Sequence, residues 1–231
     1  MSRYNFSFYE TESMQNLLDK LIRPLGASAL TLSSGQALHV VPHHPADMAT
    51  LSATARSCHQ YLTLKDGEIA ITNDPQAGGT RLSDLTLVMG VGLVGGTLML
   101  LSCRIGGTPH LTNAKKIEDE GIRIPPMPLG NSQQINRELL GSICAHPLAP
   151  AKESEILNTI AMMGRVRKNT VRALNSVKDR LDIKNYFEQS KSLFKAKLNL
   201  LPLGAQTMTE TMPDGTQLKL KIEIKEDRAV F

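Results

Sequence analysis

The stretch GEIAITNDPQAGGTRLSDLTLVMGVG, residues 67–92, decides the fold, because it places a polar loop between two apolar runs. Residues 69–71 and 85–91 are short, rich in aliphatic side chains and bounded by turn residues, which is typical of buried strands. Glycine adopts positive φ at low cost, and Asn and Asp side chains bond their own backbone, so the segment between the runs favours turns. We therefore expect two strands joined by an ordered polar loop, which is the candidate site. The turn-forming and charged residues of this loop are Asn73, Asp74, Pro75, Gly78, Gly79, Arg81 and Asp84.

The segments on both sides of this pair predict helices and further strands. The pattern indicates an α+β fold in which a mixed, largely antiparallel sheet is flanked by helices, with a long C-terminal helix and a terminal β-hairpin. We expect a core domain over residues 1–150, and a helical segment plus hairpin over residues 151–231 that packs on the same core. The other expected elements are helices over residues 10–23, 48–61, 133–145 and 153–182, and strands over residues 29–32, 37–41 and 97–103.

The end of the chain carries the clearest strand pattern, in which apolar and charged residues alternate over residues 218–225. Pro213, Asp214 and Gly215 form a turn signal before it, so we expect a hairpin with one buried face. The chain ends on Val230 and Phe231, and an unpaired apolar edge strand is a liability in a monomer. We therefore expect pairing with another chain, either a second copy in a homo-oligomer or a larger partner subunit.

The composition excludes several classes of function. A chain of 231 residues with 41% hydrophobic residues can bury a core, but only 4% are aromatic and none is Trp, which argues against stacking of bases or sugars. The net charge of +4 is concentrated over residues 165–197, where a solvated helical face explains it better than nucleic-acid binding.

The cysteines and the N-terminus indicate a cytoplasmic protein. Cys58, Cys103 and Cys144 are odd in number and without metal-binding spacing, so we expect buried thiols of a reducing compartment. The sequence has neither a secretory signal pattern nor a run of about 20 apolar residues, so no membrane association is expected.

Residues 67–84, GEIAITNDPQAGGTRLSD, resemble the hydantoinase B and 5-oxoprolinase family, which also contains subunits of the acetone and acetophenone carboxylases. The family pattern there is approximately GD-V-x-I-x-NDP-Y-x-GGTH-LPD. Further motifs follow in register over about residues 10–231. These are VVPHHPADM at 40–48, CRIGGTP at 103–109, DEGIRIPPMPL at 119–129, QINRELLGSI at 134–143 and LKLKIEIKEDRAVF at 218–231.

The resemblance implies a site of His and carboxylate side chains, which in some members hold a divalent metal. Here Arg81 occupies the imidazole position of GGTH, while Asp84 is kept and His44 aligns with a family histidine. Arginine has no lone pair for a metal, so no metal cofactor is expected. Asp84 and His44 are the two residues that would most readily contribute to one. The family's H-H-x-D positions correspond to Leu101, Ser102, Cys103 and Arg104.

These motifs define a candidate pocket whose residues have alternative interpretations. Asn73 and Asp74 either shape the loop as a turn or contact a ligand. Arg81 and Asp84 form either an internal ion pair or an anion-binding arginine oriented by Asp84. His44, with His43 beside it, is either a general base or a remaining ligand. The candidate pocket residues are Asn73, Asp74, Arg81, Asp84, His44 and Arg104.

The function expected from the resemblance is that of a shortened, non-catalytic hydantoinase B-like protein, a pseudoenzyme that acts as a structural, assembly or regulatory subunit. The alternative is a subunit of an active cyclic-amide hydrolase, or of a related ATP-dependent carboxylase, whose missing metal ligands come from a partner chain. A third possibility, binding of nucleic acid or an acidic partner by the basic helix, ranks last.

Overall fold

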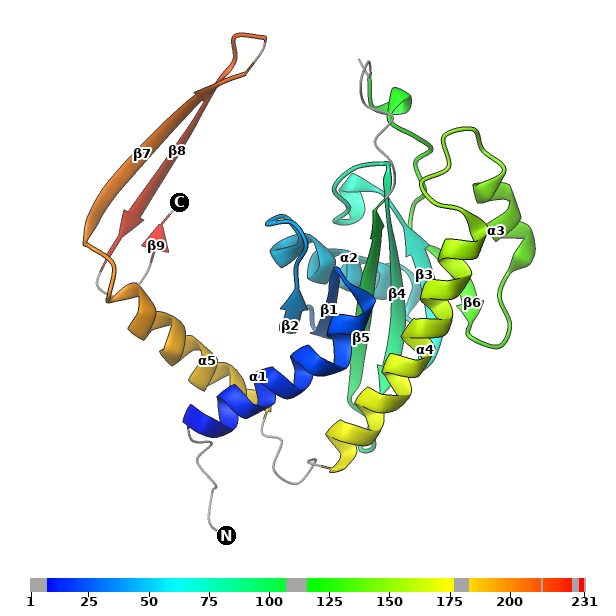
Figure 1. The fold of residues 1–231 in the computed structure, drawn as a ribbon, viewed down its shortest axis with the longest axis horizontal. Helices are drawn as coiled ribbons and strands as arrows, with labels where there is room; N and C mark the ends of the chain where they lie inside the picture. The colour runs from blue at the N-terminus through cyan, green and yellow to red at the C-terminus, as the bar shows by residue number, and fades with distance from the viewer. Residues whose placement is uncertain (1–7, 107–115, 177–182, 213, 226–228, 231) are drawn as a thin grey trace. The chain divides into compact units, whose positions relative to one another are not determined.

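The computed structural model describes residues 8–106, 116–176, 183–212, 214–225 and 229–230 (Figure 1). The chain divides into two compact units. The larger unit, Met14–Lys178, contains a six-stranded sheet and the helices on its two faces. The smaller unit combines Met1–Ser13 with Asp179–Phe231. The α+β fold class is confirmed, and within the described residues every neighbouring pair of strands is antiparallel.

The six-stranded sheet is built around the two apolar runs of the sequence. Its strand order is β2-β1-β5-β4-β3-β6, and the central pair β4 and β5 is in register from Asp84 opposite Gly106 to Gly92 opposite Leu98. Asp84 and the end of β5 therefore lie at the same end of this hairpin. The strands are β1 (Ser28–Leu32), β2 (Ala37–Val41), β3 (Glu68–Thr72), β4 (Asp84–Gly92), β5 (Leu98–Gly106) and β6 (Met127–Asn131).

Helices cover both faces of the sheet. In Figure 1, α2 (Asp47–Leu62) lies behind the central strands and α4 (Glu153–Ser176) lies in front of them. Strand β4 is buried at every position from Asp84 to Val91, which is why its sequence is a continuous apolar run and not an alternating one. On the α2 side the core contains Ala55, Cys58, Leu64, Ala70, Val88 and Leu100.

The helices match the periodicity of the sequence with some differences. The helix expected over residues 153–182 is described as α4 up to Ser176, and residues 177–182 lie outside the described residues. The remaining helices are α1 (Phe8–Ile22), α3 (Arg137–Cys144) and α5 (Ile183–Leu198), with 3-10 turns at Arg23–Leu25, Pro75–Ala77 and Ile117–Asp119.

Two elements were not predicted. Strand β6 contains Pro128 and was not among the expected strands. It is an edge strand, and an edge tolerates proline because only one side pairs. Helix α5 was not expected as a separate helix.

The smaller unit contains the expected terminal hairpin, formed by β7 (Gly204–Thr211) and β8 (Gln217–Ile224), with β9 (Ala229–Val230) beside β8. Within the smaller unit neither side of this hairpin is covered. Met208 is 61% exposed and Leu218 is 54% exposed, and every residue of β7 is exposed. Helix α4 packs on β4 and β5, whereas the expected packing of the hairpin on the same core stays a prediction.

Candidate functional site

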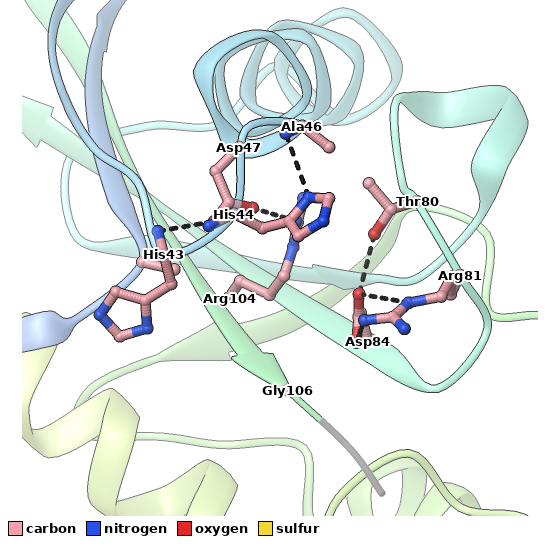
Figure 2. A pocket seen from close by; sticks show the side chains of 10 residues that line it. His43, His44, Ala46, Asp47, Thr80, Arg81, Asp84, Arg104 and Gly106 are labelled. Carbon is pink, nitrogen blue, oxygen red and sulfur yellow. Dashed lines mark hydrogen bonds and ion pairs between the residues drawn. The ribbon is translucent and has the colours of Figure 1, made fainter. Parts of the chain in front are cut away.

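A cavity of about 370 Å³ lies at the end of the β4–β5 hairpin, where helix α2 begins (Figure 2). Four segments contribute to it: the residue before β1, the loop that leads into α2, the loop that leads into β4, and the last residues of β5. The lining residues are Ala27, His43, His44, Ala46, Asp47, Thr80, Arg81, Asp84, Arg104 and Gly106. Of the predicted pocket residues, the cavity brings together His44, Arg81, Asp84 and Arg104.

The innermost charged group is an ion pair between Arg104 and Asp47. The side chain of Arg104 is 7% exposed and that of Asp47 is 2% exposed. Arg104 donates from Nη1 to Asp47 Oδ1 and from Nη2 to Thr50 Oγ1 at 2.7 Å. Asp47 Oδ2 accepts the backbone N–H groups of His43 and His44, each at 2.9 Å. The buried carboxylate therefore has a cation and two amide donors, which offset its desolvation.

A second ion pair lies at the mouth of the cavity. Arg81 donates to Asp84 from Nε at 3.3 Å and from Nη2 at 3.5 Å, and Thr80 Oγ1 donates to Asp84 Oδ2 at 2.9 Å. The side chain of Asp84 is 5% exposed, whereas that of Arg81 is 51% exposed. The short loop before β4 thus holds a guanidinium over a buried carboxylate through long hydrogen bonds.

The two histidines come from the loop that precedes α2. His44 Nδ1 accepts the backbone N–H of Ala46 at 3.2 Å, so a neutral His44 carries its proton on Nε2. The ring of His43 lies against Gly26, where an added Cβ would stand 3.0 Å from its Cε1. Only the backbone N–H groups of these residues bind Asp47. Both imidazoles line the cavity.

Asn73 and Asp74 are not among the residues that line the cavity, and they shape the loop between β3 and β4 instead. Asn73 is fully buried; its Nδ2 donates to the carbonyls of Leu82 at 2.7 Å and Ile122 at 2.8 Å, and its Oδ1 accepts the Ile124 N–H at 2.6 Å. Asp74 accepts the backbone N–H of Gln76, which is a local turn bond, and the guanidinium of Arg123, both at 2.9 Å.

The sequence analysis missed Asp47, Thr50 and Thr80. Asp47 lies in the same VVPHHPADM motif as His44, and an acidic residue in the first turn of a helix is a readable signal. Thr80 and Thr50 give no sequence signal of their own. Arg104 could be singled out from the family motif, but its partner lies 57 positions earlier in the chain.

The side chains at this cavity do not fit a divalent cation. Both oxygens of Asp47 already accept hydrogen bonds, Asp84 faces Arg81, and a guanidinium has no lone pair to donate. Within the described ranges, no three His, Cys, Asp or Glu side chains are placed to hold one metal ion. Burial raises the pKa of Cys103 to about 12, so its thiol keeps its proton and donates to the Leu25 carbonyl at 3.4 Å.

Residues 27–231 match the hydantoinase B/oxoprolinase family model, and the chain belongs to this family. The 5-oxoprolinase of Dictyostelium discoideum is 26% identical over 201 residues, which are 72% of this chain and 15% of that protein.

Two solved structures share the fold. The ATP-dependent caprolactamase of Pseudomonas jessenii has a TM-score of 0.73 and 19% identity, and the match covers 94% of this chain and 43% of that one. The nucleotide-free acetone carboxylase has a TM-score of 0.63 and 10% identity, with 94% and 34% covered. The chain therefore spans less than half the length of each of these proteins.

No helix in the described part of the chain is long and apolar enough to cross a membrane.

Proposed function

We propose that this chain is a non-catalytic hydantoinase B-like subunit that serves assembly and associates with a second copy of itself through the terminal hairpin. The observation that carries the proposal is the apolar face of that hairpin, which the residues of the described chain leave exposed.

The register of the hairpin gathers its apolar residues on one side. Met208 stands opposite Leu220, and because side chains alternate along a strand, the neighbours on this face come from every second position. The hairpin face consists of the apolar residues Met208, Leu218, Leu220, Ile222 and Ile224, and Gly204, Gln206 and Glu210 lie on the same side. The opposite side carries Ala205, Thr207, Thr209, Thr211, Gln217, Lys219, Lys221 and Glu223. The hairpin is thus amphipathic although neither side is buried.

The hairpin face continues into a groove of about 390 Å³ at the base of the hairpin. Leu201 and Leu203 line this groove together with Ile222 and Ile224, and Leu203 is 63% exposed. A contiguous exposed apolar surface marks an interaction site in most soluble proteins. Burying one Leu or Ile side chain fully contributes roughly 1.5–3 kcal/mol.

A second copy fits this surface better than a charged partner. Two-fold symmetry brings the same apolar face of each copy together and leaves the lysines of both copies on the outer sides. Strand β7 is also an edge strand, whose outer backbone groups are available to pair with a β7 strand of the second copy.

The cavity supports a role without metal catalysis, because Arg81 and Arg104 supply the cations for Asp84 and Asp47. A cytoplasmic location fits the three free cysteines. Cys58 and Cys103 are buried as expected, while Cys144 is only partly buried.

A second candidate is a subunit of an active enzyme. The similarity to a 5-oxoprolinase and to an ATP-dependent caprolactamase favours it, with groups from a partner chain completing the site. It predicts turnover of cyclic amides only in the presence of that partner.

The test compares two neighbouring residues on opposite sides of β7. Met208→Asp places a charge on the hairpin face, while Thr209→Asp places the same charge on the other side and serves as the control. Light scattering after size exclusion measures the oligomeric state. We expect wild type and Thr209→Asp to be dimers, and we expect the dimer dissociation constant of Met208→Asp to be at least about tenfold higher.

A wild-type protein that stays monomeric, or a Met208→Asp variant that dimerises like wild type, would overturn the proposal. Turnover of caprolactam or 5-oxoproline by the purified protein, alone or with a co-purifying chain, would favour the second candidate.

A further inference from the structure

We infer that the cavity at the start of α2 binds a small oxyanionic group, a carboxylate or a phosphate. The inference concerns the larger unit alone and does not depend on self-association. The cavity has more free hydrogen-bond donors than free acceptors, and this imbalance favours an acceptor-rich ligand.

The acceptors are occupied. Asp47 Oδ1 accepts from Arg104, and Asp47 Oδ2 accepts two backbone N–H groups. Asp84 Oδ2 accepts from Thr80 and Arg81, and its Oδ1 accepts from Arg81. His44 Nδ1 accepts from Ala46. A cationic or donor-rich ligand, such as an amine, would have to displace one of these bonds.

The donors are in excess. His44 presents Nε2–H, because its Nδ1 is an acceptor. The side chain of Arg104 lies at the cavity wall and is more than nine-tenths buried. Its Nε–H has no acceptor among the described residues. A buried donor without a partner destabilises the folded state, and an incoming acceptor, or a small shift of the guanidinium toward one, would recover that loss.

Arg81 is the donor that can move to the ligand. Its bonds to Asp84 are long, at 3.3 and 3.5 Å, and half of its side chain is exposed at the mouth of the cavity. When its guanidinium turns to an oxyanion, Asp84 keeps the shorter bond from Thr80 at 2.9 Å. A planar guanidinium binds a carboxylate or phosphate through two parallel hydrogen bonds, which adds geometric selectivity to the charge attraction.

The size of the cavity limits the ligand. A volume of about 370 Å³ is at the small end of ligand sites, which typically span about 300–1,000 Å³. The ligand class is therefore a small organic acid or a small phosphate compound.

The structure offers a matched control for the test. Arg123 is 50% exposed and pairs with Asp74 at 2.9 Å, so it resembles Arg81 in exposure and partner but does not line the cavity. We would titrate the full chain with sodium acetate and, separately, with inorganic phosphate. Chloride balances the ionic strength, and the backbone amide shifts in nuclear magnetic resonance report binding.

We expect the amides of His43, His44 and Thr80 to shift in wild type and in Arg123→Gln. In Arg81→Gln the dissociation constant should rise at least about tenfold, which corresponds to one charge-assisted bidentate contact. The same spectra report whether each variant is folded, and Arg81→Lys should recover only part of the affinity. A response to acetate alone assigns a carboxylate, and a response to phosphate alone assigns a phosphate.

Absence of shifts at the cavity with both anions overturns the inference. So does equal binding by Arg81→Gln and wild type, or an equal loss in Arg123→Gln. None of these results bears on dimerisation through the hairpin face.

Discussion

Asn73 contributes to stability more than its position in a polar loop suggests. Its amide joins three backbone groups, the carbonyls of Leu82 and Ile122 and the N–H of Ile124, all inside the larger unit. Asn73→Ala would leave these buried groups without their partner, so we expect the free energy of unfolding to fall by roughly 2–4 kcal/mol. Chemical denaturation measures this change.

Asn131→Ala is the matched control, because that side chain accepts two backbone N–H groups in an exposed turn. We expect it to lower the free energy of unfolding by about 0.5–1 kcal/mol. Equal losses in the two variants would contradict the role assigned to Asn73.

At this scale, the sequence was most informative where a family motif marked a residue type. Arg81, Asp84, His44 and Arg104 could be named from motifs, and they share one cavity. Asn73 could be named too, but its partners Ile122 and Ile124 lie about 50 positions away. These three residues lie in loops outside the strands, so their pairing depends on the tertiary fold and not on a local pattern of residue types.

Helix α4 makes polar contacts with the loops at the end of the sheet in addition to packing its apolar face, and the ion pair between Arg167 and Asp66 is one of them. Arg167 donates through Nε to Asp66 Oδ1 at 2.9 Å and through Nη2 to Oδ2, and Asp66 Oδ1 also accepts the Gly92 N–H at 2.7 Å. Burial alone would raise the pKa of Asp66, but the hydrogen bonds from Arg167 and Gly92 lower this pKa below its ordinary value. Asp66 therefore stabilises the fold in its charged form.

Arg167→Ala should lower the free energy of unfolding at pH 7 by about 0.5–1 kcal/mol, since the pair is partly exposed and screened by solvent. Because the folded-state pKa of Asp66 is the depressed one, its contribution is present above the unfolded-state value of about 3.9 and is lost as the pH falls through the folded-state value. The difference between variant and wild type should therefore shrink in denaturation curves below about pH 4.

Lys168→Ala, on the exposed side of α4, should match wild type at every pH. A pH-independent deficit in Arg167→Ala would point to lost packing of the arginine stem instead of the ion pair.

Helices and strands with a clear apolar pattern could be predicted from the sequence, and those without such a pattern could not. Strands β4 and β5 are continuous apolar runs, and α4 buries Ile156, Ile160, Met163 and Val166 at helical spacing. The edge strand β6 contains Pro128 and Gly130, which local patterns do not assign to a strand, and it is recognised through its pairing with β3.

The larger unit should fold without the smaller one. Residues 14–178 contain the whole six-stranded sheet and both helices that cover it, so their apolar core is complete. We expect the fragment of residues 14–178 to unfold cooperatively in a thermal melt, to be monomeric by light scattering, and to bind acetate or phosphate as the full chain does. A fragment that aggregates or lacks a cooperative transition would show that the core depends on residues outside this range.

For the molecule as a whole, the terminal hairpin is the element whose packing could not be predicted from the sequence. Alternation of Leu and Ile with Lys predicts that one side of β8 is covered, but it does not say by what. Here the side is exposed in the described chain, which supports the proposed self-association.

The two arginine–aspartate pairs also make the cavity hard to convert into a cation-binding site by single substitutions. Replacing Arg104 alone leaves Asp47 as a buried charge without its cation, which costs about 3–5 kcal/mol. Replacing Arg81 alone with histidine leaves the ion pair between Arg104 and Asp47 in the same cavity. A cation-binding pocket here would therefore require several substitutions together, because each single one yields a less stable protein or leaves the second ion pair in place.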